Sequence, residues 1–426
     1  MRGKLTRRQI DRIENILIAV LACTAIFLAG ETNLFQAFAG QGGGQDSTAA
    51  YSGMQTTEIP DTAPVALMVQ NDLGRWGARY DQDRVDQLYQ SGLKDLLVHS
   101  LDRMERPKSS RLEDWQQAVT QEDAWVCYDF QYSIPFVSAA GQQGEGRIFL
   151  VTLRGGQAES LYVFDPDTEE YWVSKIGTAG LAMPAAAQEL APNEAMFAFE
   201  HQELAQSLPS HMMVLSEAPA CLVYSVSNPL EGLDQAGLES LLETAGFNLQ
   251  AVSIYESADS TVVREGADTL RIQQDGTVIY HGSESGEARY QARSSWEGDL
   301  RAQAEGLLDQ LVGQSSGTAW FFCQGAEEQA DGRVVLTYCY QLDGACVSLK
   351  ENGWAAQFIF QGEDLLSFEL TFRCYEATET PCAVPPERQA AAAAEAQGSG
   401  GKELQLCQRD DGSGQTRALW TARETR

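Results

Sequence analysis

The feature that most constrains this chain is an apolar segment near its N-terminus. Residues 16–30, ILIAVLACTAIFLAG, carry no charge, and five basic residues precede them: Arg2, Lys4, Arg7, Arg8 and Arg12. A helix of that length measures about 22 Å, short of the roughly 30 Å bilayer core, but its continuation to Phe38 brings it to about 34 Å. One tilted transmembrane helix over residues 13–38 is therefore feasible. The basic residues place the cytoplasmic tail, residues 1–12, inside and the bulk of the chain outside.

Two other fates of this segment compete with a retained anchor. Ala37-Phe38-Ala39 followed by Gly40 matches a signal-peptidase site, although Glu31 interrupts the approach to it. Cys23 after Val20-Leu21-Ala22 allows a lipoprotein interpretation, although the residues beyond it stay apolar where a polar mature start is expected. We expect retention, with a single-pass protein in the cell membrane.

Composition places the rest of the chain among globular proteins. The 426 residues are 43% hydrophobic and 21% charged, which suits two or three domains with a sizeable core. The 60 acidic residues outnumber the 30 basic ones, giving a net charge of −30. This charge argues against nucleic acid and anionic lipid as partners, and an acidic surface keeps an exported protein soluble.

The hydrophobic pattern predicts an α+β fold. We expect a single N-terminal transmembrane helix followed by two or three extracytoplasmic domains of antiparallel sheet plus helices. A flexible, Gly- and Ser-rich linker covers residues 39–63. The domains predicted after it are an N-terminal α+β domain over residues 64–218, a middle α+β domain over 219–314 and a C-terminal α+β domain over 315–426.

Local signals place several elements inside these domains. Apolar residues at helical spacing predict one long helix over residues 85–104, and Ser110 with Glu113 predicts a capping box for the next helix. Alternating residues with Asp275-Gly276 between them predict an antiparallel meander over residues 252–280. Helices are also expected over residues 297–312 and 386–397.

The nine cysteines form no C-x-x-C motif, so neither a zinc ribbon nor a redox motif is predicted. Cys374 follows Phe368, Leu370 and Phe372 in alternation, which indicates a small core residue. An oxidising exterior would allow two bridges, Cys339 with Cys346 or Cys374 with Cys382.

The search for catalytic chemistry predicts none. Residues 313–317, GQSSG, match the G-x-S-x-G motif of a nucleophile elbow, but a helix precedes them and a strand follows, the reverse of the required order. The histidines cannot complete a serine triad after Ser315, and all four are expected at the surface or in loops: His99, His201, His211 and His281. Residues 165–170, DPDTEE, begin like a calcium loop but lack its glycine, so a β-turn is the better interpretation. No cofactor or metal site is predicted, and carboxylates are too numerous to nominate a catalytic pair.

One face of the anchor helix is the remaining candidate site. Its residues fall along one stripe of a helix, and the small side chains allow a second helix to approach closely: Ile18, Ala22, Ala25 and Ala29. We expect this stripe to contact a partner helix.

The order of segments resembles a known family. The basic and apolar N-terminus is followed by residues 73–77 (LGRWG) before a helix, then Phe247-Asn248, residues 269–280 (TLRIQQDGTVIY), residues 338–344 (YCYQLDG) and a terminal Trp420. This layout is similar to the YycH/YycI family of regulators encoded with WalK, the cell-wall sensor kinase of Gram-positive bacteria. The resemblance implies a membrane-tethered, extracytoplasmic, non-enzymatic protein that modulates a two-component sensor histidine kinase, with a sibling regulator of the same family as a possible further partner.

A second hypothesis is kept beside this one. A secreted or tethered acidic binding module could capture an envelope ligand or a cation, and it would be favoured by cleavage after Ala39. An envelope hydrolase is a third, weaker hypothesis that would need a catalytic carboxylate or Ser315.

Overall fold

The computed structural model describes Ile59 and residues 62–423, apart from residues 139–140, 178–180, 258, 284–287 and 351. These residues belong to one compact unit that covers residues 55–426. The predicted tail, anchor and partner-helix stripe, with Ile18, Ala22, Ala25 and Ala29, lie outside the described residues. None of the helices formed by the described residues is long and apolar enough to cross a bilayer.

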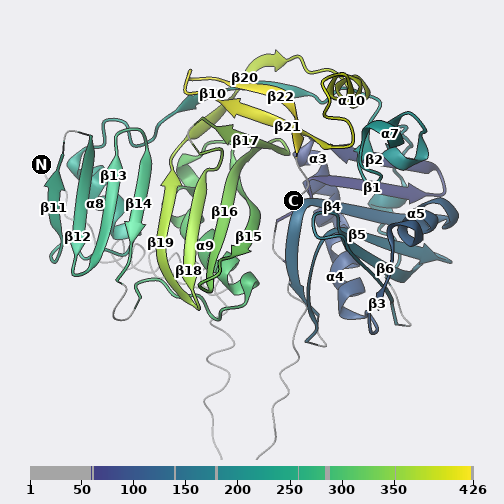
Figure 1. The fold of residues 1–426 in the computed structure, drawn as a ribbon, viewed down its shortest axis with the longest axis horizontal. Helices are drawn as coiled ribbons and strands as arrows, with labels where there is room; N and C mark the ends of the chain where they lie inside the picture. The colour runs from purple at the N-terminus through teal and green to yellow at the C-terminus, as the bar shows by residue number, and fades with distance from the viewer. Residues whose placement is uncertain are drawn as a thin grey trace, which may run out of the picture. The chain divides into compact units, whose positions relative to one another are not determined.

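The first part of the unit contains a β-sheet, which we call the N-terminal sheet, with helices packed on it. Among the described residues it has seven strands in the order β2-β1-β4-β5-β6-β7-β3, and all its ladders are antiparallel (Figure 1). The strands are β1 Ala66–Asn71, β2 Gly74–Arg79, β3 Lys108–Ser109, β4 Ala124–Val137, β5 Gln143–Arg154, β6 Gln157–Asp165 and β7 Glu170–Lys175.

The central strands of this sheet are apolar on both faces because helices or loops cover each face. In β1, Leu67 and Val69 contact one core cluster while Ala66 and Met68 contact the other, as period-two alternation requires. Three helical segments pack on the first face: α3 Gln82–Leu88, η1 Tyr89–Leu93 and α4 Lys94–Asp102. The second face carries α5 Leu112–Gln121 and the two-stranded pair of β8 Met196–Phe197 with β9 Met213–Val214.

The one long helix predicted over residues 85–104 is broken in the structure. Gly92 has φ 117° and Ser91 leaves helical geometry, so the chain bends between α3 and α4. Glycine tolerates that conformation because it has no Cβ. The cap predicted at Ser110 is also displaced by one residue, since the Arg111 N–H donates to Asp114 Oδ2 over 3.0 Å.

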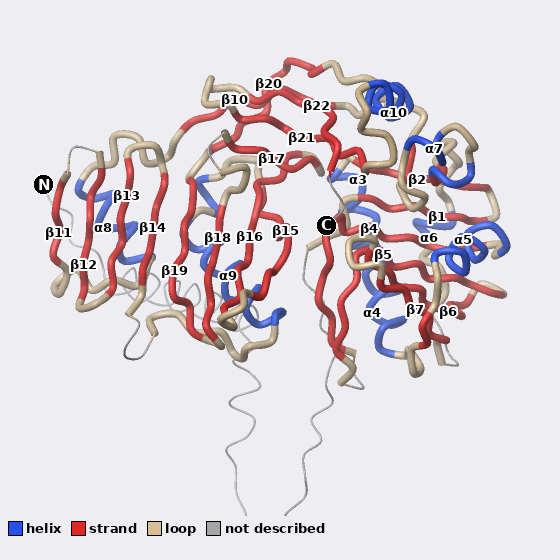
Figure 2. The backbone as a smooth tube through the Cα atoms, in the orientation of Figure 1, coloured by secondary structure: helices blue, strands red, loops and turns tan. Residues whose placement is uncertain are grey.

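The second part contains a larger sheet, which we call the large sheet. Its described strands run in the order β11-β12-β13-β14-β19-β18-β16-β17-β21-β22, with β15 paired to β16. Figure 2 shows β11 to β14 and β19 side by side as one continuous surface. The strands are β11 Ser253–Glu256, β12 Ser260–Glu265, β13 Asp268–Gln273, β14 Thr277–His281, β15 Trp320–Glu328, β16 Arg333–Leu342, β17 Ala345–Leu349, β18 Ala356–Gln361, β19 Asp364–Thr371, β21 Glu403–Asp410 and β22 Thr416–Arg423.

Two helices cover one face of the large sheet. α8 Gln235–Thr244 and α9 Glu297–Leu311 lie behind its strands in Figure 1 and share a core cluster with them. α8 begins at Asp234, whose Oδ1 accepts from the Gly237 N–H over 2.8 Å, and ends before Gly246 at φ 70°. The helix predicted over residues 297–312 is confirmed.

The remaining elements connect distant parts of the chain. β10 Cys221–Ser227 pairs antiparallel with β20 Cys374–Cys382, and β17 pairs parallel with β21. The short helices are α6 Ala185–Gln188, η2 Ala198–Glu200, α7 Leu204–Ser207, η3 Gly313–Ser315 and α10 Glu387–Ala396.

The α+β class with mostly antiparallel sheets agrees with the sequence-based expectation. The predicted middle and C-terminal domains, however, are not separate. β14 of the predicted middle domain pairs with β19 of the predicted C-terminal domain, so residues 219–314 and 315–426 share one sheet and one core. The alternation of apolar and polar residues shows which face of a strand each residue lies on, but it does not show which strands pair. The predicted domain boundary at 314/315 therefore falls inside η3, within a single folded unit.

Candidate functional site

The free edge of β11 is the most exposed part of the large sheet. Within the described residues β11 pairs with β12 alone, so one row of its backbone N–H and C=O groups lacks a neighbouring strand. Ile254 and Tyr255 on this strand are 39% and 59% exposed. A strand edge of this kind is a template for pairing with another extended chain.

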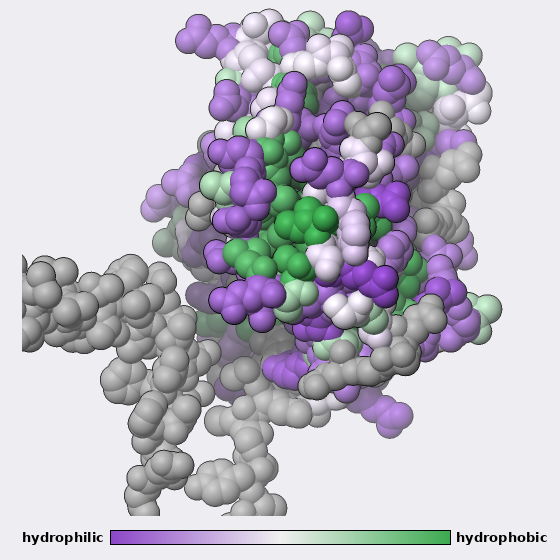
Figure 3. Space-filling view, turned by 90° about the vertical axis from the view of Figure 1, so that its left-hand side faces the viewer, coloured by the Kyte–Doolittle hydropathy of each residue, from purple (hydrophilic) through white to green (hydrophobic). Residues whose placement is uncertain are grey.

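Apolar side chains continue from the β11 edge towards α8. Ile254 lies opposite the core residue Val263, so its side chain points to the face that α8 covers. Several half-buried residues pack beside that core: Leu238, Leu241, Leu249 and Val252. Figure 3 views this end of the molecule and shows apolar side chains gathered in its middle among polar ones. The core of the large sheet is therefore partly open at the β11 end.

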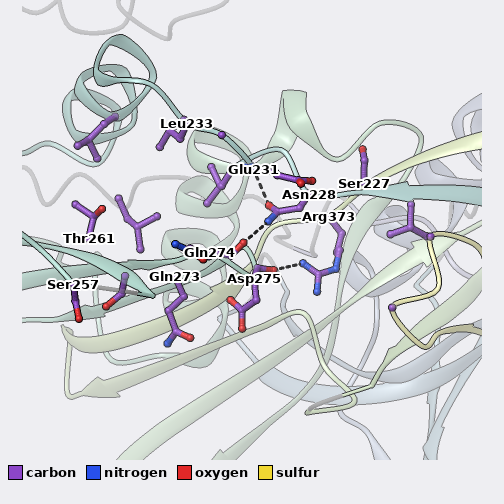
Figure 4. A pocket seen from close by; sticks show the side chains of 18 of the residues that line it. Ser227, Asn228, Glu231, Leu233, Ser257, Thr261, Gln273, Gln274, Asp275 and Arg373 are labelled. Carbon is purple, nitrogen blue, oxygen red and sulfur yellow. Dashed lines mark hydrogen bonds between the residues drawn. The ribbon is translucent and has the colours of Figure 1, made fainter.

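A cleft of about 880 Å³ lies next to this edge (Figure 4). Its walls come from the end of β10 and the loop to α8, from the β11–β12 and β13–β14 turns, from the link between β19 and β20, and from the β21–β22 turn. Residues from each segment line it: Asn228, Glu231, Glu256, Thr261, Gln274, Asp275, Arg373, Asp410 and Gly412.

Hydrogen bonds between neighbouring segments hold the cleft in shape. Asn228 Nδ2 donates to the Gln274 carbonyl over 2.9 Å, and its Oδ1 accepts from the Leu230 N–H over 2.9 Å. Arg373 Nη1 donates to the Asp275 carbonyl over 2.7 Å (Figure 4). Gly276 permits this arrangement, because a Cβ there would lie 2.7 Å from Asn228 Oδ1. The wall is therefore pre-formed.

The charges along the cleft are mostly negative. Glu231, Glu256 and Asp275 are exposed, while Asp410 is buried and its Oδ2 lies 3.6 Å from Arg373 Nε. Burial and then the Asp410 carboxylate raise the pKa of Tyr375, whose hydroxyl donates to Asp410 over 3.1 Å. With one arginine among four carboxylates, the cleft attracts basic or hydrogen-bonding groups.

A second charged cluster is buried between the N-terminal sheet and β21. Arg147 is fully buried, and its guanidinium contacts Asp129 over 3.0 Å and Glu403 Oε2 over 2.7 Å. Arg79 lies 3.5 Å from Glu387, whose pKa burial raises. The Glu403 pKa is lowered: burial opposes ionisation, but the charge of Arg147 and its hydrogen bonds outweigh it. We assign this cluster to holding β4, β5, β21 and α10 together.

The burial of His211 was not evident from the sequence. It lies in the loop between α7 and β9, as the sequence predicted, and there it is buried, with its ring 5.8 Å from the ring of Phe164. Burial lowers its pKa to about 4. Met212 and Met213, its neighbours, belong to two core clusters, and the strand signal there is only two residues long. For that reason no periodicity could reveal the burial of His211.

The other sequence motifs form ordinary turns. Ser315 lies in η3 and its hydroxyl donates to the Val312 carbonyl over 2.8 Å, and residues 313–317 follow α9 and precede β15, in the order that the sequence predicted. Residues 165–170 form the turn between β6 and β7, as expected. Among the described residues no group of three or more His, Cys, Asp or Glu side chains is placed to hold a metal ion.

The two cysteine pairs that the sequence suggested differ in geometry. Cys374 and Cys382 stand at opposite ends of β20, so eight residues of extended chain, about 27 Å, separate them and exclude a bridge. Cys374 is also half-buried rather than a core residue. Cys339 and Cys346 lie within hydrogen-bonding contact, and both are free thiols in the structure.

Sequence reasoning missed the β11 edge and the cleft. The cleft residues come from turns that are recognisable singly, such as Asp275-Gly276, but nothing local shows that these turns meet. The exposure of β11 depends on its being the last strand of the sheet, which only the topology reveals.

Comparison with known proteins gives little to place beside this geometry. No family model matches the chain, and no curated protein matches it. One solved structure, of an uncharacterized protein from Eubacterium rectale, is similar over 47% of this chain and 75% of that one, with 9% identity and a TM-score of 0.30.

Proposed function

We propose that this protein is a membrane-anchored extracytoplasmic accessory protein that modulates a two-component sensor histidine kinase. In this proposal the apolar segment anchors the chain, and its face with Ile18, Ala22, Ala25 and Ala29 contacts a helix of the kinase. The outer unit supplies the second contact. The observation that carries the proposal is the free edge of β11 with its open apolar core.

The chemistry of this edge defines the occupant. An extended segment of the kinase's outer domain would add a strand to β11 and cover Ile254 with an apolar side chain of its own. The neighbouring helix presents Glu239 and Glu243 to solvent, and Glu256 lies on β11 itself. Basic residues flanking the apolar position of that segment would therefore complement the surface.

Substitution of one residue on the edge tests this contact. Ile254→Lys places a charge where the added strand would bury it, and a cost of about 1.4 kcal/mol already lowers affinity tenfold. We expect the output of the cognate response regulator in cells to shift towards the value seen when the gene for this protein is deleted.

Trp320→Lys is the matched control. Trp320 is 54% exposed on β15, away from β11, so this variant carries the same type of change on the same sheet and should keep wild-type output. Wild-type output from a folded, normally abundant Ile254→Lys variant would refute the contact at β11.

The cleft favours a second candidate function, a tethered or secreted binding module. Its pre-formed walls and polar lining are suited to an envelope ligand with basic or hydrogen-bonding groups. A mature form beginning at Gly40 in the culture medium would support this function. Full retention of the protein in the membrane fraction would count against the secreted form of this module.

A further inference from the structure

The strand pair β10–β20 brings two cysteines together that are far apart in sequence. Cys221 and Cys382 are direct Cα partners in this antiparallel ladder. Directly opposed residues in such ladders have Cα atoms about 4.5 to 5.5 Å apart, and a disulfide accepts about 4.4 to 6.8 Å. Their side chains also share one face, since paired residues point the same way. The Cα separation expected from this register therefore lies within the range that a disulfide accepts.

The surroundings of the two thiols agree with the register. Cys221 belongs to a core cluster with Tyr80, Ala345 and Leu406, and Cys382 packs against the same cluster. Burial, and then the proximity of Cys382, raise the pKa of Cys221 to about 12. Cys382 is half-buried, so a reagent can approach this pair from the Cys382 side.

This end of the strand pair is weakly held by backbone hydrogen bonds. Leu222 lies opposite Pro381, which has no N–H to donate, and the register shifts between Leu222 and Tyr224. Past the shift, four further residue pairs continue the ladder as far as Ser227 and Cys374. A covalent bond at Cys221 would fix the part of the ladder that the backbone leaves loose.

We propose that Cys221 and Cys382 form a disulfide when the protein meets an oxidant of the disulfide class. The Cys382 thiolate attacks the oxidant, giving a mixed disulfide and releasing one thiol. The Cys221 thiolate then attacks the Cys382 sulfur and releases the second thiol. Two protons and two electrons leave the protein, and one oxidant disulfide becomes two thiols. The bond joins the start of β10 to the end of β20, and the cleft lies at the other end of β10.

Purified full-length protein in detergent tests the proposal without reference to its cellular location. The protein is equilibrated with oxidised and reduced glutathione, its remaining thiols are alkylated, and the digest is analysed by mass spectrometry. We expect a peptide that links Cys221 to Cys382, lighter by two hydrogens than the two separate peptides. Cys127 is the internal control, because its strand neighbours are Met68 and Leu150, and it should be alkylated.

Two variants sharpen the result. Cys382→Ser should leave Cys221 as a thiol that is alkylated after unfolding, and dithiothreitol should lower Tm by about 3 to 6 °C in the wild type alone. Ser227→Cys, opposite Cys374 at the other end of the ladder, should create a second bridge and so verify the register. Alkylation of both Cys221 and Cys382 in the oxidised wild type, or their pairing with other cysteines, would overturn the proposal.

The test is separate from that of the kinase contact. If the bond forms in the glutathione buffer but is missing from protein isolated from cells, the proposal that Cys221 and Cys382 can pair stands, and the result counts against export of the protein. Failure of the bond in the buffer would remove the site and leave the β11 contact unaffected.

Discussion

Folding lowers the pKa of His211 and so suppresses its ordinary titration. Its Nε2 has no hydrogen-bond partner within the described structure, and the charges of Arg147, Arg79, Glu403 and Asp129 act on it. Burial is the main cause of its low pKa, and the two arginines act in the same direction against the two carboxylates. The neutral ring is therefore the form that the fold accepts.

The stability of the protein should fall as the pH drops below the ordinary histidine value. The unfolded chain binds this proton near pH 6.5 and the folded chain only near pH 4, so protonation favours unfolding in that window. Between pH 7.5 and 5 the loss from this residue is roughly 2 kcal/mol. Urea unfolding at both pH values should show His211→Gln losing less stability than the wild type by that amount.

The exposed His281 provides the control for this measurement. Buried Glu387, with a raised pKa, acts in the opposite sense, because its stabilising protonated form is lost as the pH rises. It contributes equally to wild type and variant, so the difference between them isolates His211. An identical pH dependence in wild type, His211→Gln and His281→Gln would contradict the neutral, buried ring.

At the scale of elements, Arg147 joins the N-terminal sheet to β21. It lies on β5, and its partners are Asp129 on β4 and Glu403 on β21. Arg147→Met removes the cation that contacts both Asp129 and Glu403 and leaves Glu403 only the arginines at 4.0 Å, which should cost about 3 kcal/mol of unfolding free energy. Chemical denaturation measures this loss as a lower transition midpoint.

An exposed arginine on the same strand calibrates the effect. Arg154 pairs with Glu122 and Glu159 but is 67% exposed, so Arg154→Met should cost less than about 1 kcal/mol. Equal midpoints for the Arg147→Met and Arg154→Met variants would show that the buried cluster does not join the two sheets.

Elements that pair with their neighbours in sequence could be predicted, and elements that pair with distant segments could not. The meander β11 to β14 was predicted because each strand pairs with the next one and Asp275-Gly276 supplies a hairpin turn. The β10–β20 pair and the parallel β17–β21 ladder join segments separated by many residues, for which no local signal exists. The predicted boundary between residues 314 and 315 was wrong, because β14 pairs with β19 across it and the segment on each side has the pattern of a complete domain.

The candidate site follows the same rule. The turn at Asp275, which lines the cleft, was predicted from the Asp275-Gly276 pair. Only the order of the strands in the sheet shows that the segments lining the cleft meet, and only that order shows that Ile254 and Tyr255 are exposed. The buried Arg147 could not be recognised, since a sequence shows a charge without showing the carboxylates that will neutralise it.

At the scale of the whole molecule, the proposed contact at β11 belongs to a single compact unit. Residues 55–426 form a single compact unit in which the buried charges join the N-terminal sheet to β21. A contact made at the β11 edge would therefore be transmitted through a packed body rather than through a chain of loosely joined domains. That arrangement suits a protein that biases a kinase between two states.

The most direct test places a photo-reactive amino acid at Tyr255 of the full-length protein in cells. Tyr255 is 59% exposed on the free edge of β11, within reach of an added strand. The same probe at Trp320 is the control. We predict that Tyr255, and not Trp320, forms a covalent adduct with a membrane sensor histidine kinase identified by mass spectrometry. A Tyr255 probe that yields no kinase adduct, or the same products as the Trp320 probe, would contradict it.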